Sequence, residues 1–440
     1  MKYRSTAGKS PEVSLEQAVV KGLAPDRGLY MPLEFPRLSE DFIKRLPEMS
    51  LPEMASEIAM ALFGEDVDKD KLKALTEETM NFPIPLVKVT DNKYSLELFH
   101  GPTLAFKDVG ARFMARLLGY FNRNNKERLV NVLVATSGDT GSAVANGFLG
   151  VEGVRVFVLY PKGKVSPIQE SQFTTLGRNI VALEVDGTFD DCQALVKQAF
   201  LDPELNEKMM LTSANSINVA RFLPQMFYYF HAYAQAVKAG VDPENVVVCV
   251  PSGNFGNITA GLIAKKMGLP IKRFIAANNA NDIFYEYLKT GEYKPRHSVQ
   301  TIANAMDVGD PSNFARVLDL YGSDHDAICA EISGTTYTDD EIAATVKSTL
   351  EETGYQLDPH GAVGYRALTE LLEPGETGIF LETAHPAKFK ETVEAITGKE
   401  VAIPERLQAF MAGTKQSIEI PADFPAFKYL LLTHLTSDRH

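Results

Sequence analysis

Short apolar runs recur along the chain from about residue 93 onward, each bounded by glycine, proline or polar residues. They are too short for core helices and are rich in Val and Ile, so they predict buried strands of mainly parallel sheets. The runs are YSLELF (94–99), LVNVLVA (129–135), VRVFVLY (154–160), NIVALEV (179–185), NVVVCV (245–250), RFIAAN (273–278) and TGIFLETA (377–384).

Helical patterns occupy the segments between these runs. Apolar residues recur every four positions from Val109 to Phe121, which places them on one face of a helix. A second helix, over 339–353, is expected to start at Thr338, with Glu341 completing a capping box. Strands that alternate with helices indicate an α/β fold. Two series of this alternation predict two lobes, with a site between them at the carboxyl ends of the strands.

The N-terminal part of the chain lacks this alternation. It carries a predicted helix capped by Ser14 and running through Val20, and further predicted helices near 39–47, 51–63 and 69–79. Pro83 and Pro85 end the region. We therefore expect an N-terminal helical extension and two α/β lobes. The expected units are an N-terminal region (1–92), a first lobe with the candidate amine (93–225) and a second lobe with the candidate phosphate-binding loop (226–440).

The composition is that of a folded protein with a large core, because 45% of the 440 residues are hydrophobic and 23% are charged. The net charge of −13 argues against a nucleic-acid or anionic-membrane partner, since these require a positive field. Neither a secretory signal nor an apolar run of roughly 18 residues is present, so we expect a cytoplasmic protein. The three cysteines form no CxxC pair, and no metal site is expected.

Two glycine-containing turns are candidate anion sites. The first, VPSGNFGN (250–257), joins an apolar strand to a helix, where glycines admit an anion close to the backbone and the helix N-terminus attracts negative charge. It matches neither GxxxxGK[ST] nor GxGxxG, so a P-loop ATPase or a dinucleotide enzyme is not indicated. The second, ATSGDTG (135–141), has the same build. The alternative for each is an ordinary strand–helix turn.

Lys107 is the candidate nucleophile. It lies in HGPTLAFKD (100–108), between an apolar strand and an amphipathic helix, where burial would lower its pKa and leave an amine able to form a Schiff base. The alternative is an ordinary solvated lysine. At the end of the last strand, Thr383 offers a neutral hydroxyl and Lys388 a cation, unless this segment is a polar surface loop.

Taken together and in this order, HGPTLAFKD, ATSGDTG, VPSGNFGN and ETAHPAKF resemble the threonine synthase family, in its long bacterial and fungal form. Four further segments are similar to that family, so the resemblance covers nearly the whole chain. These segments are DRGLYMP (26–32), YPKGKVSPIQ (160–169), SANSINVARFLPQ (213–225) and NAMDVGDPSNF (304–314). The resemblance implies the two-lobed fold that pyridoxal-phosphate enzymes share with tryptophan synthase β.

Further implications of the resemblance concern the cofactor, pyridoxal 5'-phosphate. Its aldehyde would bind Lys107 as a Schiff base, and its pyridine nitrogen would meet Thr383, a hydroxyl partner that leaves the ring neutral. The residues implied to hold its phosphate are Ser252, Gly253, Asn254, Phe255, Gly256 and Asn257.

The implied reaction converts O-phospho-L-homoserine and water into L-threonine and phosphate, by γ-elimination and then β-hydration. The expected substrate contacts are Ser137, Thr140, Asn215, Ser216, Arg221 and Lys388, the alternative being a structural hydrogen-bond network. Asp139 stands where many relatives of the wider class carry Asn against the phenolic oxygen of the cofactor, and a carboxylate there would repel a phenolate. No contact is therefore assigned to Asp139.

Two other functions remain open from the sequence. One is a pyridoxal-phosphate-dependent phospho-lyase that ends in 2-oxobutyrate and ammonia, and the other is a non-catalytic anion-binding homologue. The small-molecule substrate would be the main partner of the chain, which we expect to be a monomer or a homodimer.

Overall fold

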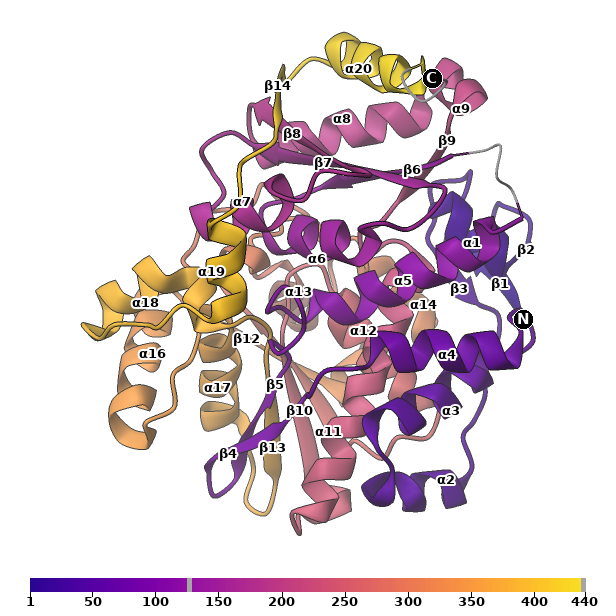
Figure 1. Ribbon diagram of the computed structural model, residues 1–440. Helices are drawn as coiled ribbons and strands as arrows, with labels where there is room; N and C mark the ends of the chain where they lie inside the picture. The colour runs from indigo at the N-terminus through magenta and orange to yellow at the C-terminus, as the bar shows by residue number, and fades with distance from the viewer. Residues whose placement is uncertain (125–128, 437–440) are drawn as a thin grey trace.

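Two mainly parallel sheets and one small N-terminal sheet organise the chain in the computed structural model, which describes residues 1–124 and 129–436 (Figure 1). The larger sheet has six strands. All neighbouring strands in it run parallel except the last pair, which is antiparallel. In spatial order its strands are β12 (Ile332–Thr336), β11 (Arg273–Asn278), β10 (Val246–Pro251), β13 (Thr377–Glu382), β5 (Lys93–Glu97) and β4 (Leu86–Thr90).

The second sheet has five strands, and every neighbouring pair is parallel. In spatial order they are β14 (Ile418–Pro421), β8 (Ile180–Asp186), β7 (Val154–Pro161), β6 (Val130–Ala135) and β9 (Met210–Ser213). All residues of β6 are buried, as are all those of β10, which explains why these strands read as continuous apolar runs. The α/β prediction with mainly parallel sheets is therefore confirmed.

Helices between the two sheets share one core with both of them, and Figure 1 places α5, α6 and α12 there. Alternate strand residues divide between this shared core and an outer one: Val132 and Val134 face the shared core, whereas Leu133 belongs to the outer core under α8 and α20. The shared helices are α5 (Lys107–Asn122), α6 (Asp139–Phe148), α11 (Met226–Lys238) and α12 (Gly256–Lys266). The outer ones are α8 (Phe189–Leu201), α20 (Phe424–Thr436), α16 (Asp339–Thr353) and α17 (Pro359–Leu371).

The predicted helices are present. Helix α5 buries Val109, Phe113 and Leu117. Helix α16 starts from Thr338 with the expected capping box to Glu341. The remaining helices of the lobes are α7 (Pro167–Thr174), α9 (Pro203–Lys208), α10 (Val219–Phe222), α13 (Ile283–Thr290), α14 (Phe314–Leu320), α15 (His325–Glu331), α18 (Lys390–Thr397) and α19 (Glu405–Met411).

The N-terminal region contains more strand than the sequence predicted. Besides α1 (Leu15–Lys21), α2 (Glu40–Arg45), α3 (Leu51–Phe63) and α4 (Lys69–Thr79), it forms a sheet of β2 (Val13–Ser14), β1 (Lys2–Ser5) and β3 (Tyr30–Pro32). These strands are only two to four residues long, which is too short for a hydrophobic periodicity that would predict them.

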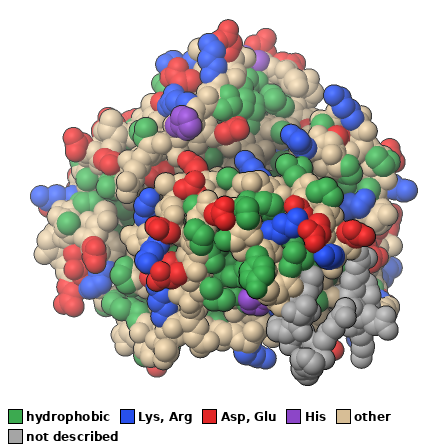
Figure 2. All heavy atoms as spheres, turned by 90° about the horizontal axis from the view of Figure 1, so that it is seen from above, with side chains coloured by type: hydrophobic (Ala, Val, Ile, Leu, Met, Phe, Trp, Pro, Cys, Tyr) green, Lys and Arg blue, Asp and Glu red, His purple; other side chains and the backbone are tan. Residues whose placement is uncertain are grey.

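The order of the strands in the two large sheets does not follow their order in the chain. Strand β5 pairs with β13 in the six-stranded sheet, and β14, near the C-terminus, pairs with β8 in the five-stranded sheet. The division at residues 93 and 226 therefore stays a prediction about chain segments. No helix in the described part of the chain is long and apolar enough to cross a membrane. On the face seen in Figure 2, basic and acidic side chains are interspersed.

Candidate active site

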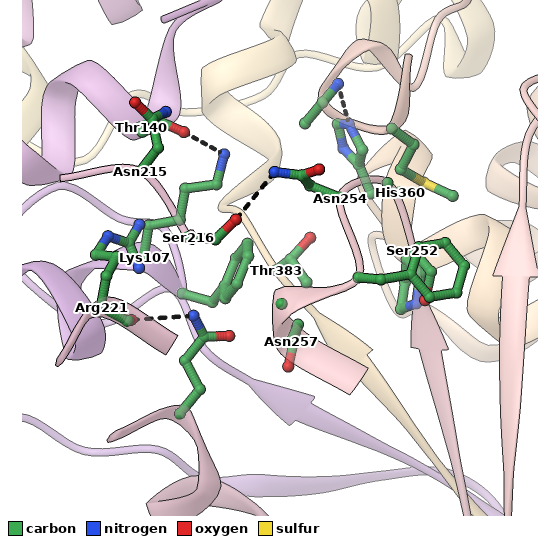
Figure 3. Close-up of a pocket in the computed structure, with 18 residues that line it drawn as sticks. Lys107, Thr140, Asn215, Ser216, Arg221, Ser252, Asn254, Asn257, His360 and Thr383 are labelled. Atoms are coloured by element: carbon green, nitrogen blue, oxygen red, sulfur yellow. Dashed lines mark hydrogen bonds between the residues drawn. The ribbon is translucent and has the colours of Figure 1, made fainter. Parts of the chain in front are cut away.

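A pocket opens where the carboxyl ends of strands from both large sheets come together, as expected for a two-lobed α/β fold. Loops after β9, β10 and β13 each contribute to it, and so do the N-termini of α5 and α6 (Figure 3). Its lining residues are Phe106, Lys107, Thr140, Asn215, Ser216, Arg221, Gln225, Pro251, Ser252, Gly253, Asn254, Phe255, Gly256, Asn257, Ala305, Met306, His360 and Thr383.

Lys107 is the first residue of α5, and its Nζ donates a hydrogen bond of 2.8 Å to Oγ1 of Thr140 (Figure 3). Burial lowers the pKa of Lys107 to about 8, the Asp139 carboxylate opposes this shift, and the cations of Arg221 and Lys388 add to it. With this pKa, roughly a tenth of the amine is neutral at pH 7, and that fraction is able to attack an aldehyde. This is the desolvated lysine that the sequence predicted.

The loop before Lys107 is fixed by its own polar residues and by the end of β13. The Asp108 carboxylate accepts hydrogen bonds from the Thr103 N–H (2.9 Å) and from the Thr103 hydroxyl (2.7 Å). The Phe106 N–H donates to the carbonyl of Thr383 at 2.8 Å. This main-chain hydrogen bond brings the Lys107 amine and the Thr383 hydroxyl to the same pocket, although the two residues are 276 positions apart in the sequence.

The segment after β10 presents a series of unused donors. No residue in the described part of the chain accepts a hydrogen bond from the main-chain N–H groups of 253–257. Phe255 adopts a left-handed conformation (φ 66°), which turns the chain into α12, and its ring packs on Phe284. Exposed N–H groups at a helix N-terminus form a site for a phosphate. Ser252 is different, because its N–H donates to Ala277 and its hydroxyl to Val250.

Asn257 adds an oriented donor to this loop. Its Oδ1 accepts hydrogen bonds from the hydroxyls of Tyr228 (2.5 Å) and Tyr229 (2.7 Å), which fixes the amide so that Nδ2 remains without a partner although it is buried. A buried donor at a pocket wall is costly unless a ligand accepts from it. Together with the free N–H groups, it fits the phosphate of pyridoxal phosphate. The hydroxyl of Thr383 also has no partner among the described residues, and it fits a ring nitrogen.

The pocket also brings together four of the six predicted substrate contacts: Thr140, Asn215, Ser216 and Arg221. The most informative is Arg221, which is only 2% exposed and whose Nε and Nη1 have no acceptor in the described chain. Burial lowers the pKa of its guanidinium to about 10. A buried, unpaired cation at a pocket wall calls for an anionic ligand, because the unpaired charge is costly.

Ser137 and Lys388 do not line the pocket. Lys388 is completely buried and donates to Asp139 at 2.6 Å and to the carbonyl of Thr103 at 2.9 Å. Although burial raises the pKa of Asp139, the charges of Lys388 and Lys107 outweigh it and lower the pKa to about 2. Asp139 is therefore a carboxylate whose charge is balanced by Lys388, a pairing that the sequence analysis did not foresee.

The sequence did not point to several of the lining residues, among them Gln225, Ala305, Met306 and His360. His360 follows Asp358 and Pro359, which do signal a helix start. Nothing local shows that its ring reaches Ala305, 55 residues away in the sequence. The described residues contain no group of His, Cys, Asp or Glu that could hold a metal ion.

Comparison with known proteins agrees with this geometry. Residues 85–379 match the family model described as pyridoxal-phosphate dependent enzyme, so the fold and the pocket define a member of that class. Residues 2–80 match the model of the threonine synthase N terminus, and residues 361–430 match its C-terminal model.

Relatives that match over the full length identify the family within this class of enzymes. The threonine synthase of Haemophilus influenzae is 48% identical over 96% of this chain and 98% of its own. The crystal structure of threonine synthase from Escherichia coli has a TM-score of 0.91 at 43% identity, over 99% of this chain and 100% of that one. The pyridoxal-phosphate-bound threonine synthase of Brucella melitensis has a TM-score of 0.92 at 38% identity, over 99% of each chain. The chain belongs to the threonine synthase family.

Proposed function

We propose that this chain converts O-phospho-L-homoserine and water into L-threonine and phosphate, with pyridoxal phosphate held at Lys107. The observation that carries the proposal is that one pocket has two separate provisions for anions. One is the set of free N–H groups at 253–257, and the other is the unpaired guanidinium of Arg221. A phosphorylated cofactor and a phosphorylated amino acid together require both.

The cofactor's phosphate is assigned to the amides of 253–257 and to Nδ2 of Asn257, because these donors lack partners within the described chain. Ser252 shapes the loop from the end of β10, since its own N–H and hydroxyl are already bonded. The hydroxyl of Thr383 is assigned to the pyridine nitrogen. When bound, pyridoxal phosphate supplies an electron sink for the negative charge that develops at the substrate's Cα.

The substrate's phosphate is assigned to Arg221, with Asn215 and Ser216 beside it on the same pocket wall. Ser216 is oriented because its hydroxyl accepts hydrogen bonds from Asn254 (2.9 Å) and Asn313 (3.0 Å), so its own proton remains for a ligand. Thr140, at the start of α6, is assigned to the substrate's carboxylate, since the first N–H groups of a helix favour a negative group.

Lys107 is the group that moves protons in this proposal. With a pKa of about 8, its Nζ can accept a proton from the substrate's carbon and return it near neutral pH. The hydrogen bond from Nζ to Thr140 keeps the amine on the side of the pocket assigned to the substrate. Arg221, being unable to give up its proton near neutral pH, stabilises the phosphate as it leaves.

Replacing Lys107 tests both parts of the proposal. Purified Lys107→Ala should lose the absorbance of covalently bound pyridoxal phosphate and lose threonine formation from O-phospho-L-homoserine. Lys162→Ala is the matched control, because Lys162 is an exposed lysine paired with Glu419. Wild-type protein that forms 2-oxobutyrate in excess of threonine would instead be a phospho-lyase. Wild-type protein that binds no pyridoxal phosphate would be a non-catalytic homologue.

A further inference from the structure

His360 lies at the pocket wall, and both of its ring nitrogens are already engaged by the protein. Nε2 accepts a hydrogen bond of 3.1 Å from the N–H of Ala305 (Figure 3). The ring proton is therefore on Nδ1, which donates to Asp358 at 2.5 Å. The ring is 2% exposed. A histidine held at both nitrogens has no lone pair left for a substrate, which argues against a role as a base.

Asp358 is itself held in place. It is the N-cap of α17, where its side chain accepts the N–H of Gly361 at 2.7 Å, and its own N–H donates to Glu382 at 2.8 Å. Burial and the neighbouring Asp358 raise the pKa of Glu382, whereas His360 and Glu382 outweigh the effect of burial on Asp358 and lower its pKa. The carboxylate form is therefore favoured at Asp358, and its hydrogen bond to Nδ1 fixes the tautomer of His360.

The partner of His360 is a short stretch of chain that forms one side of the pocket. We call residues 303–307, which include the single turn η4 (Asn304–Met306), the 303–307 wall. Ala305 and Met306 line the pocket. The wall lies directly on the phosphate-binding loop, because a Cβ added to Gly253 would be 2.9 Å from the Ala305 carbonyl oxygen and 2.9 Å from the Met306 Cα.

The 303–307 wall is attached to the rest of the lobe at both ends and in its middle. At its start, the carbonyl of Ala303 accepts a hydrogen bond of 3.2 Å from Asn279. At its end, Asp307 accepts hydrogen bonds from the Thr301 hydroxyl (2.7 Å) and from Asn279 (2.9 Å). In its middle, the N–H of Ala305 donates to His360. This is the side-chain hydrogen bond that the described structure shows to the main chain of residues 304–306. Without it, the middle of the wall would keep only its packing and the hydrogen bonds within its own turn, from Met306 to Ala303 and from Asp307 to Asn304.

We propose that His360 is a positioning residue that holds the 303–307 wall against the phosphate-binding loop, with Asp358 fixing the ring for this task. The wall then stays at a constant distance from Lys107, and the ligands bind in the space between them. The identity of those ligands rests on the proposed function. The attachment of the wall does not, so the two can fail independently.

Hydrogen exchange of the holoenzyme, followed by mass spectrometry on peptides that cover 303–307, tests the attachment directly. In His360→Ala, amide exchange in the wall should rise about 3- to 10-fold, as expected for the loss of one hydrogen bond. His360→Gln should recover part of the protection, because its amide oxygen can accept from Ala305. Asp358→Asn retains the helix cap and removes only the charge, so it should give a smaller rise.

Steady-state kinetics separates positioning from chemistry. His360→Ala should raise KM for O-phospho-L-homoserine about 10-fold with a smaller effect on kcat, and His360→Gln should return KM toward wild type. His231→Gln is the matched control, since His231 is a half-buried histidine outside the pocket lining, and it should change neither wall exchange nor KM.

Two results would overturn the proposal. Wall exchange in His360→Ala equal to wild type would mean that the bond to Ala305 does not hold the wall. A large fall in kcat with KM unchanged would mean that His360 acts in the chemistry. If His360→Ala does not fold, His360→Phe, which fills the same space without an acceptor for Ala305, carries the same test. Unchanged exchange and KM in Asp358→Asn would reject the role of Asp358. If the wild-type protein makes no threonine but exchange in the wall rises in His360→Ala, only the proposed function is rejected.

Discussion

Lys388 and Asp139 form a fully enclosed ion pair, with 2.6 Å between Nζ and Oδ1, and both charges act on the amine of Lys107. Lys388 lies in the turn η5 (Pro386–Phe389) after β13 of the six-stranded sheet, whereas Asp139 begins α6 after β6 of the five-stranded sheet. The pair therefore joins the two sheets beside the pocket and supplies no net charge there.

Removing one partner of this pair should be far more harmful than removing both. Lys388→Met leaves the Asp139 carboxylate buried and unpaired, and should lower the free energy of unfolding by about 3–5 kcal/mol. Adding Asp139→Asn removes the stranded charge and should restore most of that loss. Urea denaturation of the two single variants and the double variant measures the coupling. A double variant no more stable than Lys388→Met would contradict it.

Lys107 should reduce the stability of the protein when the cofactor is absent. Its pKa is about 8 in the folded chain and 10.5 in the unfolded chain, so at pH 7 the folded state carries a poorly solvated ammonium. Lys107→Met should therefore make the apoprotein about 2–3 kcal/mol more stable at pH 7. The gain should begin to shrink as the pH rises above 8 and be absent above 10.5, where both states of wild type are neutral.

Urea unfolding of the apoproteins between pH 7 and pH 10 measures this difference. Lys162→Met serves as the control, because Lys162 is an exposed lysine in an ion pair with Glu419. A gain in Lys107→Met that stays constant over this pH range would mean that lost packing or the bond to Thr140, rather than the charge, sets the difference.

Gly253 should be irreplaceable for lack of space rather than for backbone strain, since it is not among the residues with positive φ. A Cβ there would meet the Ala305 carbonyl oxygen and the Met306 Cα at 2.9 Å, so the loop and the 303–307 wall would have to separate. Gly253→Ala should weaken the binding of pyridoxal phosphate by at least about 10-fold, with overpacking of this kind costing roughly 1–3 kcal/mol. Titration of the apoprotein with pyridoxal phosphate, followed by absorbance, gives the affinity, and wild-type affinity in this variant would exclude the clash.

Local signals were sufficient for most of the fold and for part of the site. Apolar runs such as 129–135 predicted buried parallel strands. The position of Lys107 between a strand and an amphipathic helix made it a candidate, and the family resemblance favoured it over an ordinary solvated lysine. The short strands β1, β2 and β3 were not predictable, because a strand of two to four residues has no measurable period.

Contacts between distant segments explain the remaining failures. Lys388 was expected to meet an anionic ligand, but it pairs with Asp139, and nothing near either residue in the sequence specifies the other. His360 was overlooked for the same reason, since Ala305 is its partner only in the folded chain. The sequence identified the residue types that carry charge, and tertiary packing decided which charges remain free for a ligand.

Two buried arginines allow this distinction to be tested. Arg316 is 0% exposed, and its guanidinium donates to the carbonyls of Tyr30, Ser216 and Ile217 and to the side chain of Asn313. Arg221 is 2% exposed, and two of its guanidinium nitrogens have no acceptor in the described chain. The two arginines are equally buried, but only Arg316 is paired. The same substitution is therefore expected to have opposite effects on stability at the two positions.

Arg316→Met should lower the free energy of unfolding by about 3–5 kcal/mol, because it leaves several buried carbonyls without donors. Arg221→Met should leave the apoprotein equally stable or more stable, because it replaces an unpaired buried charge with an apolar chain of similar length. The same variant should raise KM for O-phospho-L-homoserine at least about 10-fold, since the substrate's phosphate loses its cation. Urea unfolding and steady-state kinetics provide the two measurements. A destabilised Arg221→Met with unchanged KM would show that the Arg221 charge serves the fold, and the substrate's phosphate would then have to bind elsewhere.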